Sequence, residues 1–245
     1  MLLGKKGLVF GVTNKNSIGW AVACAWRNAG ADVSVVVQED RFKSKLQGSC
    51  FTCDVTKDAD LLKCKNEFVS TVGSHVDMIM HSIAYAPKES LRGNLMDCTR
   101  EDFATTMDIS VFSFLAIARA FHPLMSENSS LMCMTYDGSA RTVPGYGLMG
   151  PAKAALETCT RYLAMELGTH GIRVNGISAG PINTLAARGI ANFHVMKENA
   201  KNKSPLGKNV SAGDVGDMAA FLASDASKSI TGQILYVDAG HSIVK

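Results

Sequence analysis

The sequence lacks the charge excess, repeats and polar stretches that mark several classes of protein. Over 245 residues the formal net charge is only +3. No basic stretch is interleaved with aromatic side chains, so we expect no nucleic-acid partner. No internal repeat, low-complexity tract or linker rich in Pro, Gly or Ser divides the chain. With 47% hydrophobic residues there is ample material for one large core, and we expect a single domain over residues 1–245.

Targeting and membrane-spanning segments are also missing. Met1–Phe10 has neither a charged region followed by an apolar core nor an Arg- and Ser-rich pattern, so we expect no export. No uninterrupted apolar run approaches the length that crosses a bilayer. The 7 cysteines are odd in number, and free thiols imply a reducing compartment. These absences predict a cytoplasmic protein with no membrane partner.

No metal site is predicted. Cys50 and Cys53 have C-x-x-C spacing, but no second Cys pair or His pair completes a zinc set. Phe51 lies between them in a strand-like run, so we expect both cysteines on one face of a strand as buried structural thiols.

Short apolar runs rich in β-branched residues alternate with longer segments of helical periodicity. The runs are Gly7–Phe10, Asp32–Val37, Ser49–Cys53, Val76–His81, Ser130–Thr135, Arg173–Ser178 and Gln233–Val237. The helical segments are Ser17–Ala29, Ala59–Val72, Arg100–Met125, Gly147–Gly168 and Ala212–Ser224. This alternation is typical of parallel strands joined by crossover helices. It predicts an α/β fold, a doubly wound, Rossmann-like parallel sheet of about seven strands with helices on both faces.

The turn after the first predicted strand has features of a nucleotide site. Gly11 at the strand end permits a tight turn and lets a pyrophosphate approach the backbone, while the next helix start offers free N–H groups. Ser17 is a candidate N-cap or phosphate ligand. The common G-x-G-x-x-G pattern is absent, since only Gly11 and Gly19 remain. An ordinary strand–helix turn is therefore the alternative.

The residue after the second predicted strand bears on cofactor choice. Gln38 stands where a dinucleotide fold places the residue that meets the adenosine ribose. Glu39 and Asp40 would repel a 2′-phosphate, although Arg41 and Lys43 weaken that argument. The balance favours NADH over NADPH.

The ends of the third and fourth predicted strands supply further cofactor candidates. Asp54, which is followed by Val55, offers a carboxylate suited to the adenine amino group; a turn or helix cap is the alternative role. The fourth strand is followed by Ser82, Ile83 and Ala84. We expect these residues to leave space for the nicotinamide ribose.

Tyr136, Tyr146 and Lys153 stand between a buried strand and a helix. Pro151 is tolerated only in the first turn of a helix, which predicts a helix start near residue 147 or 148. Seven residues at about 100° each return to nearly the same helix face. We therefore expect Tyr146 and Lys153 to line one cleft; a chance pairing at a common spacing is the alternative.

The Tyr146-x6-Lys153 arrangement behind a dinucleotide loop resembles the enoyl-acyl-carrier-protein reductases, a divergent branch of the short-chain dehydrogenases. The ordinary short-chain dehydrogenase triad is absent, because Met149 and Tyr136 stand where those enzymes carry Tyr and Ser. The likeness covers essentially the whole chain. Further matching segments are residues 81–87, 108–110, 141–144, 171–175, 178–182, 184–187, 205–206 and 237–238.

This resemblance implies reduction of a trans-2-enoyl thioester by hydride transfer from NADH, the last step of the fatty-acid elongation cycle. It implies that Tyr146 donates a hydrogen bond to the thioester oxygen, where negative charge develops. Lys153 would bind the cofactor ribose, and Tyr136 would share the donor role or line the acyl pocket. The remaining cofactor contacts that the resemblance implies are Ile18, Ile182 and Thr184.

The resemblance also implies a substrate lid over residues 185–203. Ile190, Phe193 and Met196 would wall an acyl channel with Tyr85 opposite; a core helix is the alternative. The carrier would be acyl carrier protein or coenzyme A, and the assembly a homotetramer. Relatives often carry basic residues on the lid for the acidic carrier. Here the basic side chains lie slightly further on, at Lys197, Lys201 and Lys203, and a solvated helix face is the alternative interpretation of these three lysines.

Two other functions remain open from the sequence. Asp137 stands where an apolar residue is usual, which favours a specialised enoyl-thioester or enone reductase outside primary fatty-acid synthesis. A non-catalytic dinucleotide sensor on the same scaffold is the other, although Tyr146 and Lys153 argue against it.

Gly145 and Gly147 loosen the backbone around Tyr146.

Overall fold

Parallel strands form one seven-stranded sheet in the computed structural model, which describes residues 1–92, 94–190 and 192–244. The strands are β1 Lys6–Phe10, β2 Asp32–Val37, β3 Cys50–Thr52, β4 Met78–His81, β5 Ser130–Thr135, β6 Arg173–Ala179 and β7 Ile234–Val237. Their order is β3-β2-β1-β4-β5-β6-β7, and every neighbouring pair is parallel. The doubly wound fold predicted from the sequence is confirmed, since each predicted run overlaps one of these strands.

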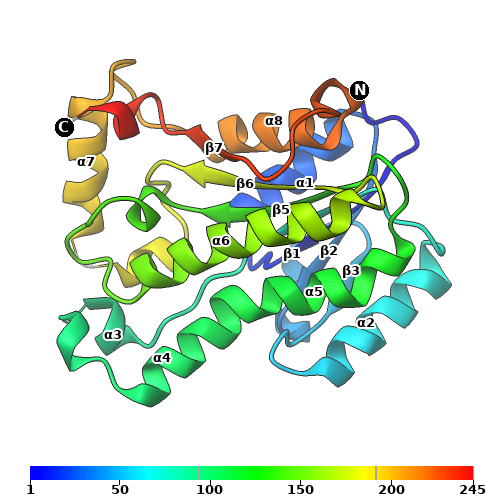
Figure 1. Cartoon of the computed structure of the whole chain (residues 1–245), viewed down its shortest axis with the longest axis horizontal. Coiled ribbons are helices and arrows are strands. Elements are labelled where there is room, and N and C mark those ends of the chain that lie inside the picture. The colour runs from blue at the N-terminus through cyan, green and yellow to red at the C-terminus, as the bar shows by residue number, and fades with distance from the viewer. Residues whose placement is uncertain (93, 191, 245) are drawn as a thin grey trace.

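Helices cover both faces of the sheet (Figure 1). They are α1 Ile18–Asn28, α2 Asp58–Thr71, α3 Lys88–Arg92, α4 Arg100–Met107, α5 Ser113–Phe121, α6 Met149–Gly168, α7 Phe193–Lys203 and α8 Ala212–Ala223. A π-helical turn, Asp108–Phe112, joins α4 to α5. One face carries α1 and α8, while α2, α5 and α6 lie on the other.

The two faces of the sheet have separate hydrophobic cores because successive strand residues point to opposite sides. Leu8 and Phe10 lie in the core under α2, α5 and α6, whereas Val9 lies in the core under α1 and α8. The prediction that Cys50 and Cys53 share a face is wrong. Cys50 packs against the α1/α8 core and Cys53 belongs to the other, as a spacing of three residues in an extended chain requires.

The long helix Arg100–Leu124, which runs through α4 and α5, could cross a membrane by length and composition alone. An expectation based on uninterrupted apolar runs misses it, because polar residues such as Ser110 and Ser113 interrupt the sequence. Phe114, Ile117 and Phe121 are fully buried in the core. The helix therefore has the packing of a core helix.

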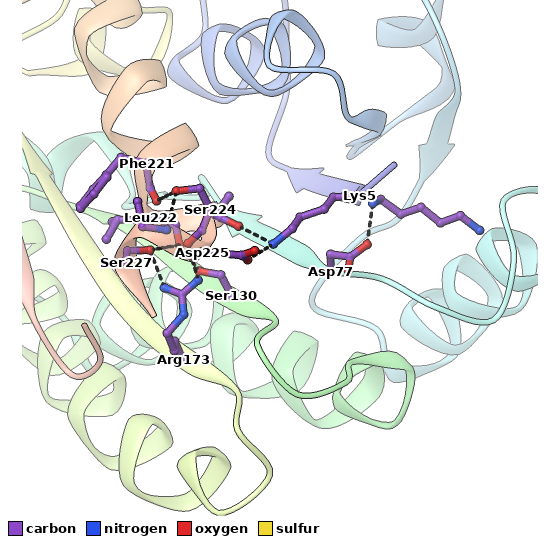
Figure 2. Close-up of polar contacts among 12 residues, drawn as sticks. Lys5, Asp77, Ser130, Arg173, Phe221, Leu222, Ser224, Asp225 and Ser227 are labelled. Atoms are coloured by element: carbon purple, nitrogen blue, oxygen red, sulfur yellow. Dashed lines mark hydrogen bonds and ion pairs between the residues drawn. The ribbon is translucent and has the colours of Figure 1, made fainter. Parts of the chain in front are cut away.

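Polar side chains bind the carboxyl end of α8 at the amino edge of the sheet (Figure 2). Ser130, Lys5 and Arg173 donate to the carbonyl oxygens of residues 222, 223 and 224, at 2.9, 3.4 and 3.4 Å respectively. Cationic donors suit this end of a helix, where the last carbonyls lack intrahelical partners and carry partial negative charge. These bonds join α8 to β5, β6 and the residue before β1, and so fix its axis along the sheet.

Helices α1 and α8 approach closely through a glycine. A Cβ atom at Gly216 would lie 2.9 Å from the carbonyl oxygen of Ala21 and 2.9 Å from the Cβ of Ala25. Small residues on both helices thus allow near backbone contact, which orients the amino end of α1 toward the carboxyl edge of the sheet.

We predict that Gly216→Ala lowers the free energy of unfolding by about 1–2 kcal/mol, because overpacking against backbone outweighs the gain in helix propensity. Gly213→Ala in the same helix is the control, since its nearest neighbour would be 3.4 Å away. Urea unfolding of both variants checks this. A Gly216→Ala protein as stable as Gly213→Ala would contradict the close packing.

Candidate active site

Loops after β1, β4, β5 and β6 converge at the carboxyl edge of the sheet, where open parallel sheets place their ligands. The turn after β1 begins at Gly11, whose φ is +86°. A Cβ there would lie 2.2 Å from the carbonyl oxygen of Ser82. Glycine is therefore required for the β1 turn to pack against the end of β4, and this contact keeps the loop close to the sheet.

The amino end of α1 is capped by Ser17. Its hydroxyl accepts a hydrogen bond from the backbone N–H of Trp20 at 3.2 Å and donates to the carbonyl of Asn14 at 2.8 Å. Ser17 thus fills the N-cap role, one of the two predicted for it. Ile18 begins the helix.

A cavity of about 490 Å³ lies between the β1–α1 loop and the segment after β6. Its lining includes Lys15 and the predicted residues Ile182 and Thr184, together with Ala212 at the first position of α8. A lysine and nearby helix amino ends suit a diphosphate. The cavity and the glycine turn beside it fit the predicted dinucleotide.

The predicted adenosine end holds Gln38, which is exposed directly after β2. Glu39 pairs with Arg41 at 2.7 Å, and Asp40 pairs with Lys43 at 2.9 Å. The two cations that could attract a 2′-phosphate are thus paired with carboxylates. This arrangement agrees with the preference for NADH.

Asp54 lies after β3 next to the half-buried Val55. Its carboxylate accepts hydrogen bonds from the backbone N–H and the hydroxyl of Thr56, and pairs with Lys57 at 3.2 Å. These contacts are those of a turn, one of the alternative roles that the sequence left open, whereas helix α2 begins later, at Asp58, with no side-chain cap.

The end of β4 is tied to the π-helical turn. Ser110 Oγ accepts from the backbone N–H of Tyr85 at 2.9 Å and donates to its carbonyl at 2.8 Å. This pair of bonds positions the segment that contains Ser82, Ile83 and Ala84. The Tyr85 side chain is half exposed at the same edge.

Tyr136 and Tyr146 form the centre of the site. Their ring centroids are 4.9 Å apart in an edge-to-face arrangement. Burial raises the pKa of Tyr136 to about 12 and places that of Tyr146 still higher. Both phenols are therefore neutral hydrogen-bond donors at physiological pH.

The backbone around Tyr146 is not helical. Helix α6 begins at Met149, and Gly145 and Gly147 have φ values of +77° and +46°. The prediction that helical spacing brings Tyr146 and Lys153 onto one face is therefore wrong in its reasoning. Tyr146 is placed instead by packing on Tyr136 and on Gly138, where a Cβ would lie 2.6 Å from the Tyr146 ring.

Lys153 lies on α6 and is 4% exposed. Its Nζ donates to the carbonyl oxygen of Met134 at 2.7 Å, two residues before Tyr136. Among the described residues this is its only acceptor, so two of the three ammonium donors are available to a ligand. Burial lowers the pKa of Lys153 to about 8.

A neutral histidine lies at the end of β4. His81 Nε2 is 2.7 Å from Ser113 Oγ, and that hydroxyl donates its proton to the carbonyl of Ile109 at 2.6 Å. The Nε2 atom must therefore carry the proton. Burial and the nearby charge of Lys153 lower the pKa of His81 to about 3.

The predicted lid contacts the tyrosine pair. Residues Ala186–Gly189 form a short 3₁₀ turn and α7 follows it, while residue 191 of the predicted range lies outside the described residues. The Tyr136 hydroxyl donates to Met196 Sδ at 3.4 Å. Ile190 packs against the core, and Phe193 is half buried.

Asp137 is buried directly after Tyr136. The charged groups that act on its carboxylate are Arg141, at 3.8 Å, together with His241, Asp238 and Glu157. Burial raises the pKa of Asp137. Two of these four groups, His241 and Asp238, belong to the C-terminal segment, and none belongs to the predicted lid, so these contacts give no support to an altered acyl pocket.

Two contributors were not singled out in the sequence. Glu157 accepts hydrogen bonds from Thr135 and Ser139, and its position four residues after Lys153 on the same helix could have indicated it. Ser110 lies in a segment that matches the family, but its role was not predictable, because its bonds to Tyr85 depend on a π-helical turn.

Comparisons with known proteins all point to one family. A family model described as enoyl-(acyl carrier protein) reductase matches residues 11–242. The NADH enoyl-acyl-carrier-protein reductase FabI of Aquifex aeolicus is 41% identical over 253 residues, which span 100% of this chain and 93% of that protein. FabI of Bacillus cereus is 37% identical over 100% of this chain and 99% of that protein.

The solved structures that this chain resembles belong to the same family. The crystal structure of the Aquifex aeolicus reductase superposes with a TM-score of 0.95 at 40% identity, covering 99% of this chain and 98% of that one. The Anaplasma phagocytophilum reductase in complex with NAD gives a TM-score of 0.94 at 36% identity, covering 99% and 95%.

We predict that Gly147→Ala costs about 3 kcal/mol of unfolding free energy, because the residue has positive φ and its Cβ would lie 2.2 Å from the carbonyl oxygen of Ser90. Gly207→Ala is the matched control, with a φ of +63° but nothing within 4 Å, and should cost about 1 kcal/mol. Thermal unfolding compares the two. Equal losses in the two variants would mean that the positive φ, and not the close approach of α3, makes glycine necessary at residue 147.

Proposed function

We infer, because this chain belongs to the enoyl-(acyl carrier protein) reductase family, that its site takes NADH and an enoyl thioester. The protein is an NADH-dependent enoyl-acyl-carrier-protein reductase, which reduces the C2=C3 bond of a trans-2-enoyl chain in the last step of fatty-acid elongation. The observation that carries this function is the tyrosine pair, in which Tyr146 is buried and Tyr136 half-buried, and whose supporting segment is bonded to the Lys153 ammonium.

NADH, when bound, supplies the hydride that is added to C3 of the enoyl chain. Negative charge then develops on the thioester oxygen, and a fixed donor there lowers the barrier. Tyr146 is the donor that we assign, because its phenol stays protonated at neutral pH and its ring is held between Tyr136 and Gly138. Tyr136 lines the acyl pocket and can share this role.

Lys153 binds the ribose hydroxyls of the cofactor and contributes positive potential near the developing enolate. Its burial and its single acceptor, the Met134 carbonyl, leave directed N–H groups for a ligand. Removing bulk water around an ammonium strengthens its interaction with a nearby negative charge.

The other cofactor contacts follow the carboxyl edge of the sheet. The diphosphate lies at the turn of Gly11, Ser17 and Ile18, with Ile182 and Thr184 across the cavity. Gln38 meets the adenosine ribose. The remaining residues of the cofactor site are Asp54 and Val55 at the adenine, and Ser82, Ile83 and Ala84 at the nicotinamide end.

The acyl chain lies between the tyrosine pair and the lid, residues 185–203, within a single catalytic domain of residues 1–245. Ile190, Phe193 and Met196 form one wall, with Tyr85 on the other side of the entrance. The Tyr136–Met196 contact supports this placement because it joins the lid to the centre of the site.

The carrier is an acyl carrier protein, an acidic partner, and it docks beside α7. Lys201 and Lys203 lie in the last turn of this helix, with Lys197 one turn before Lys201. Positive side chains near the acyl entrance steer an acidic partner through long-range attraction. A coenzyme A thioester is a smaller substrate for the same pocket.

The enzyme works as a homotetramer in the cytoplasm, with no nucleic-acid or membrane partner. Large apolar side chains on α4, α6 and the π-helical turn support subunit contacts, since exposed apolar patches mark interaction surfaces. They are Phe103, Phe112, Tyr162 and Met165, which are 48%, 44%, 62% and 69% exposed.

We predict that the wild-type protein oxidises NADH in the presence of a crotonyl or dodecenoyl thioester, and that Tyr146→Phe lowers kcat by about 100- to 1000-fold. Loss of the hydroxyl removes a donor used in the transition state, so the NADH dissociation constant should stay near the wild-type value. Absorbance at the NADH band gives the rates, and a simple ketone is the control substrate. NADH binding without oxidation would indicate a dinucleotide sensor instead.

We also predict that NADH affinity falls as pH rises through about 8, the pKa of the Lys153 ammonium. Below that pH the group is charged and binds the ribose; above it one donor and the charge are lost. Lys153→Ala should weaken NADH binding by about 10- to 100-fold and abolish this pH dependence. Fluorescence titration measures both, and equal affinity in the two proteins would contradict the assignment.

A further inference from the structure

A carboxylate on α6 gathers the two hydroxyls that flank Tyr136. Glu157 Oε1 accepts from Thr135 Oγ1 at 2.7 Å and from Ser139 Oγ at 2.5 Å. One oxygen atom thus binds side chains on both sides of the tyrosine. Such charge-assisted bonds are stronger than neutral ones, so the carboxylate restrains the segment that carries Tyr136.

The restrained segment includes the surface on which Tyr146 rests. Gly138 lies between the two hydroxyl-bearing residues, and a Cβ there would come within 2.6 Å of the Tyr146 ring and 3.3 Å of the Tyr136 ring. With such close packing, a shift of this segment displaces both phenols. Glu157 therefore acts on the reacting centre without touching it.

Lys153 holds the same segment from one helical turn earlier. Its bond to Met134 and the bonds of Glu157 attach the end of β5 to α6 at two successive turns. Residues four apart on a helix are neighbours on its surface. The carboxylate is consequently one helical turn from the ammonium, close enough to act on it through its charge, and is bonded to the tyrosine segment.

The groups that act on Lys153 come from three elements. Burial lowers its pKa, while Cys133 on β5 and Glu157 on α6 oppose that shift. Burial raises the pKa of the Cys133 thiol to about 11, so the thiol is uncharged when Lys153 titrates. His81 on β4 is neutral as well. Glu157 is then the negative charge that counteracts the cost of burying the ammonium.

We propose that Glu157 is a positioning residue that performs two tasks through one carboxylate: it fixes the Tyr136 segment through Thr135 and Ser139, and it supplies the negative charge beside the Lys153 ammonium. This inference rests on the proposed function, in which Lys153 binds the cofactor. A merely structural Glu157 would serve the first task alone.

The test separates the charge from the hydrogen bonds. Glu157→Gln keeps an acceptor oxygen and removes the charge, whereas the double variant Thr135→Val/Ser139→Ala keeps the charge and removes both donors. NADH dissociation constants are measured by fluorescence from pH 6 to pH 10. We expect the alkaline loss of affinity to move down by about one pH unit in Glu157→Gln and to stay in place in the double variant.

The double variant should lower kcat about tenfold, the effect of a modestly displaced donor, with the NADH dissociation constant unchanged. Glu157→Asp, which retains the charge, should move the alkaline limb back toward the wild-type position. Circular dichroism and thermal unfolding verify that each variant is folded. If Glu157→Gln does not fold, the double variant still decides the positioning task. Glu157→Asp then decides the charge task, because its shorter side chain draws the negative charge away from the ammonium and should shift the alkaline loss of affinity down by less than one pH unit.

If a folded Glu157→Gln protein loses NADH affinity at the same alkaline pH as the wild type, the charge role is overturned while the proposed function stays intact. An unchanged kcat in the double variant would overturn the positioning role. If the wild-type protein itself shows no alkaline loss of NADH affinity, the ribose role of Lys153 fails, and this inference fails with it.

Discussion

The hydrogen bond from the Lys153 ammonium to the Met134 carbonyl holds the active site together. It joins the first turns of α6 to the last residues of β5 at 2.7 Å, in a place that is almost closed to water. An ammonium in such surroundings loses hydration and needs acceptors in return. The Met134 carbonyl provides one, and a bound ribose can provide others. The same burial that lowers the pKa of Lys153 thus prepares the group for a ligand.

The tyrosine pair depends on this attachment because both rings rest on the segment that follows Met134. Gly138 permits the Tyr146 ring to lie against the backbone, and Gly147 permits α3 to approach the turn after it. These close contacts leave the two phenols little freedom, and fixed donors are more effective than mobile ones in stabilising developing charge. Strand β5, α6 and the turn between them therefore act as one rigid support. The proposed lid contacts this support through Met196.

The fold was predictable because strand and helix periodicities are local properties of the sequence. Each apolar run overlaps a strand, and the alternation with helical segments identifies the parallel sheet. The grouping of Tyr136, Tyr146 and Lys153 in one place was expected from the family resemblance, and the structure brings them together. The reasoning from helical spacing was wrong, since Tyr146 precedes α6 and is placed by tertiary packing. Bonds between distant elements, such as those of Glu157 and Ser110, carry no periodic signal and became visible only in the structure.

The orientation of two side chains in the complex tests the account most directly. A crystal structure with NAD and an enoyl thioester analogue measures the distances from Tyr146 Oη to the thioester oxygen and from Lys153 Nζ to the ribose oxygens. Our account predicts hydrogen bonds at both places, at about 2.7–3.1 Å. A complex in which the phenol and the ammonium point away from the nicotinamide ring, with no other donor at the thioester oxygen, would contradict it.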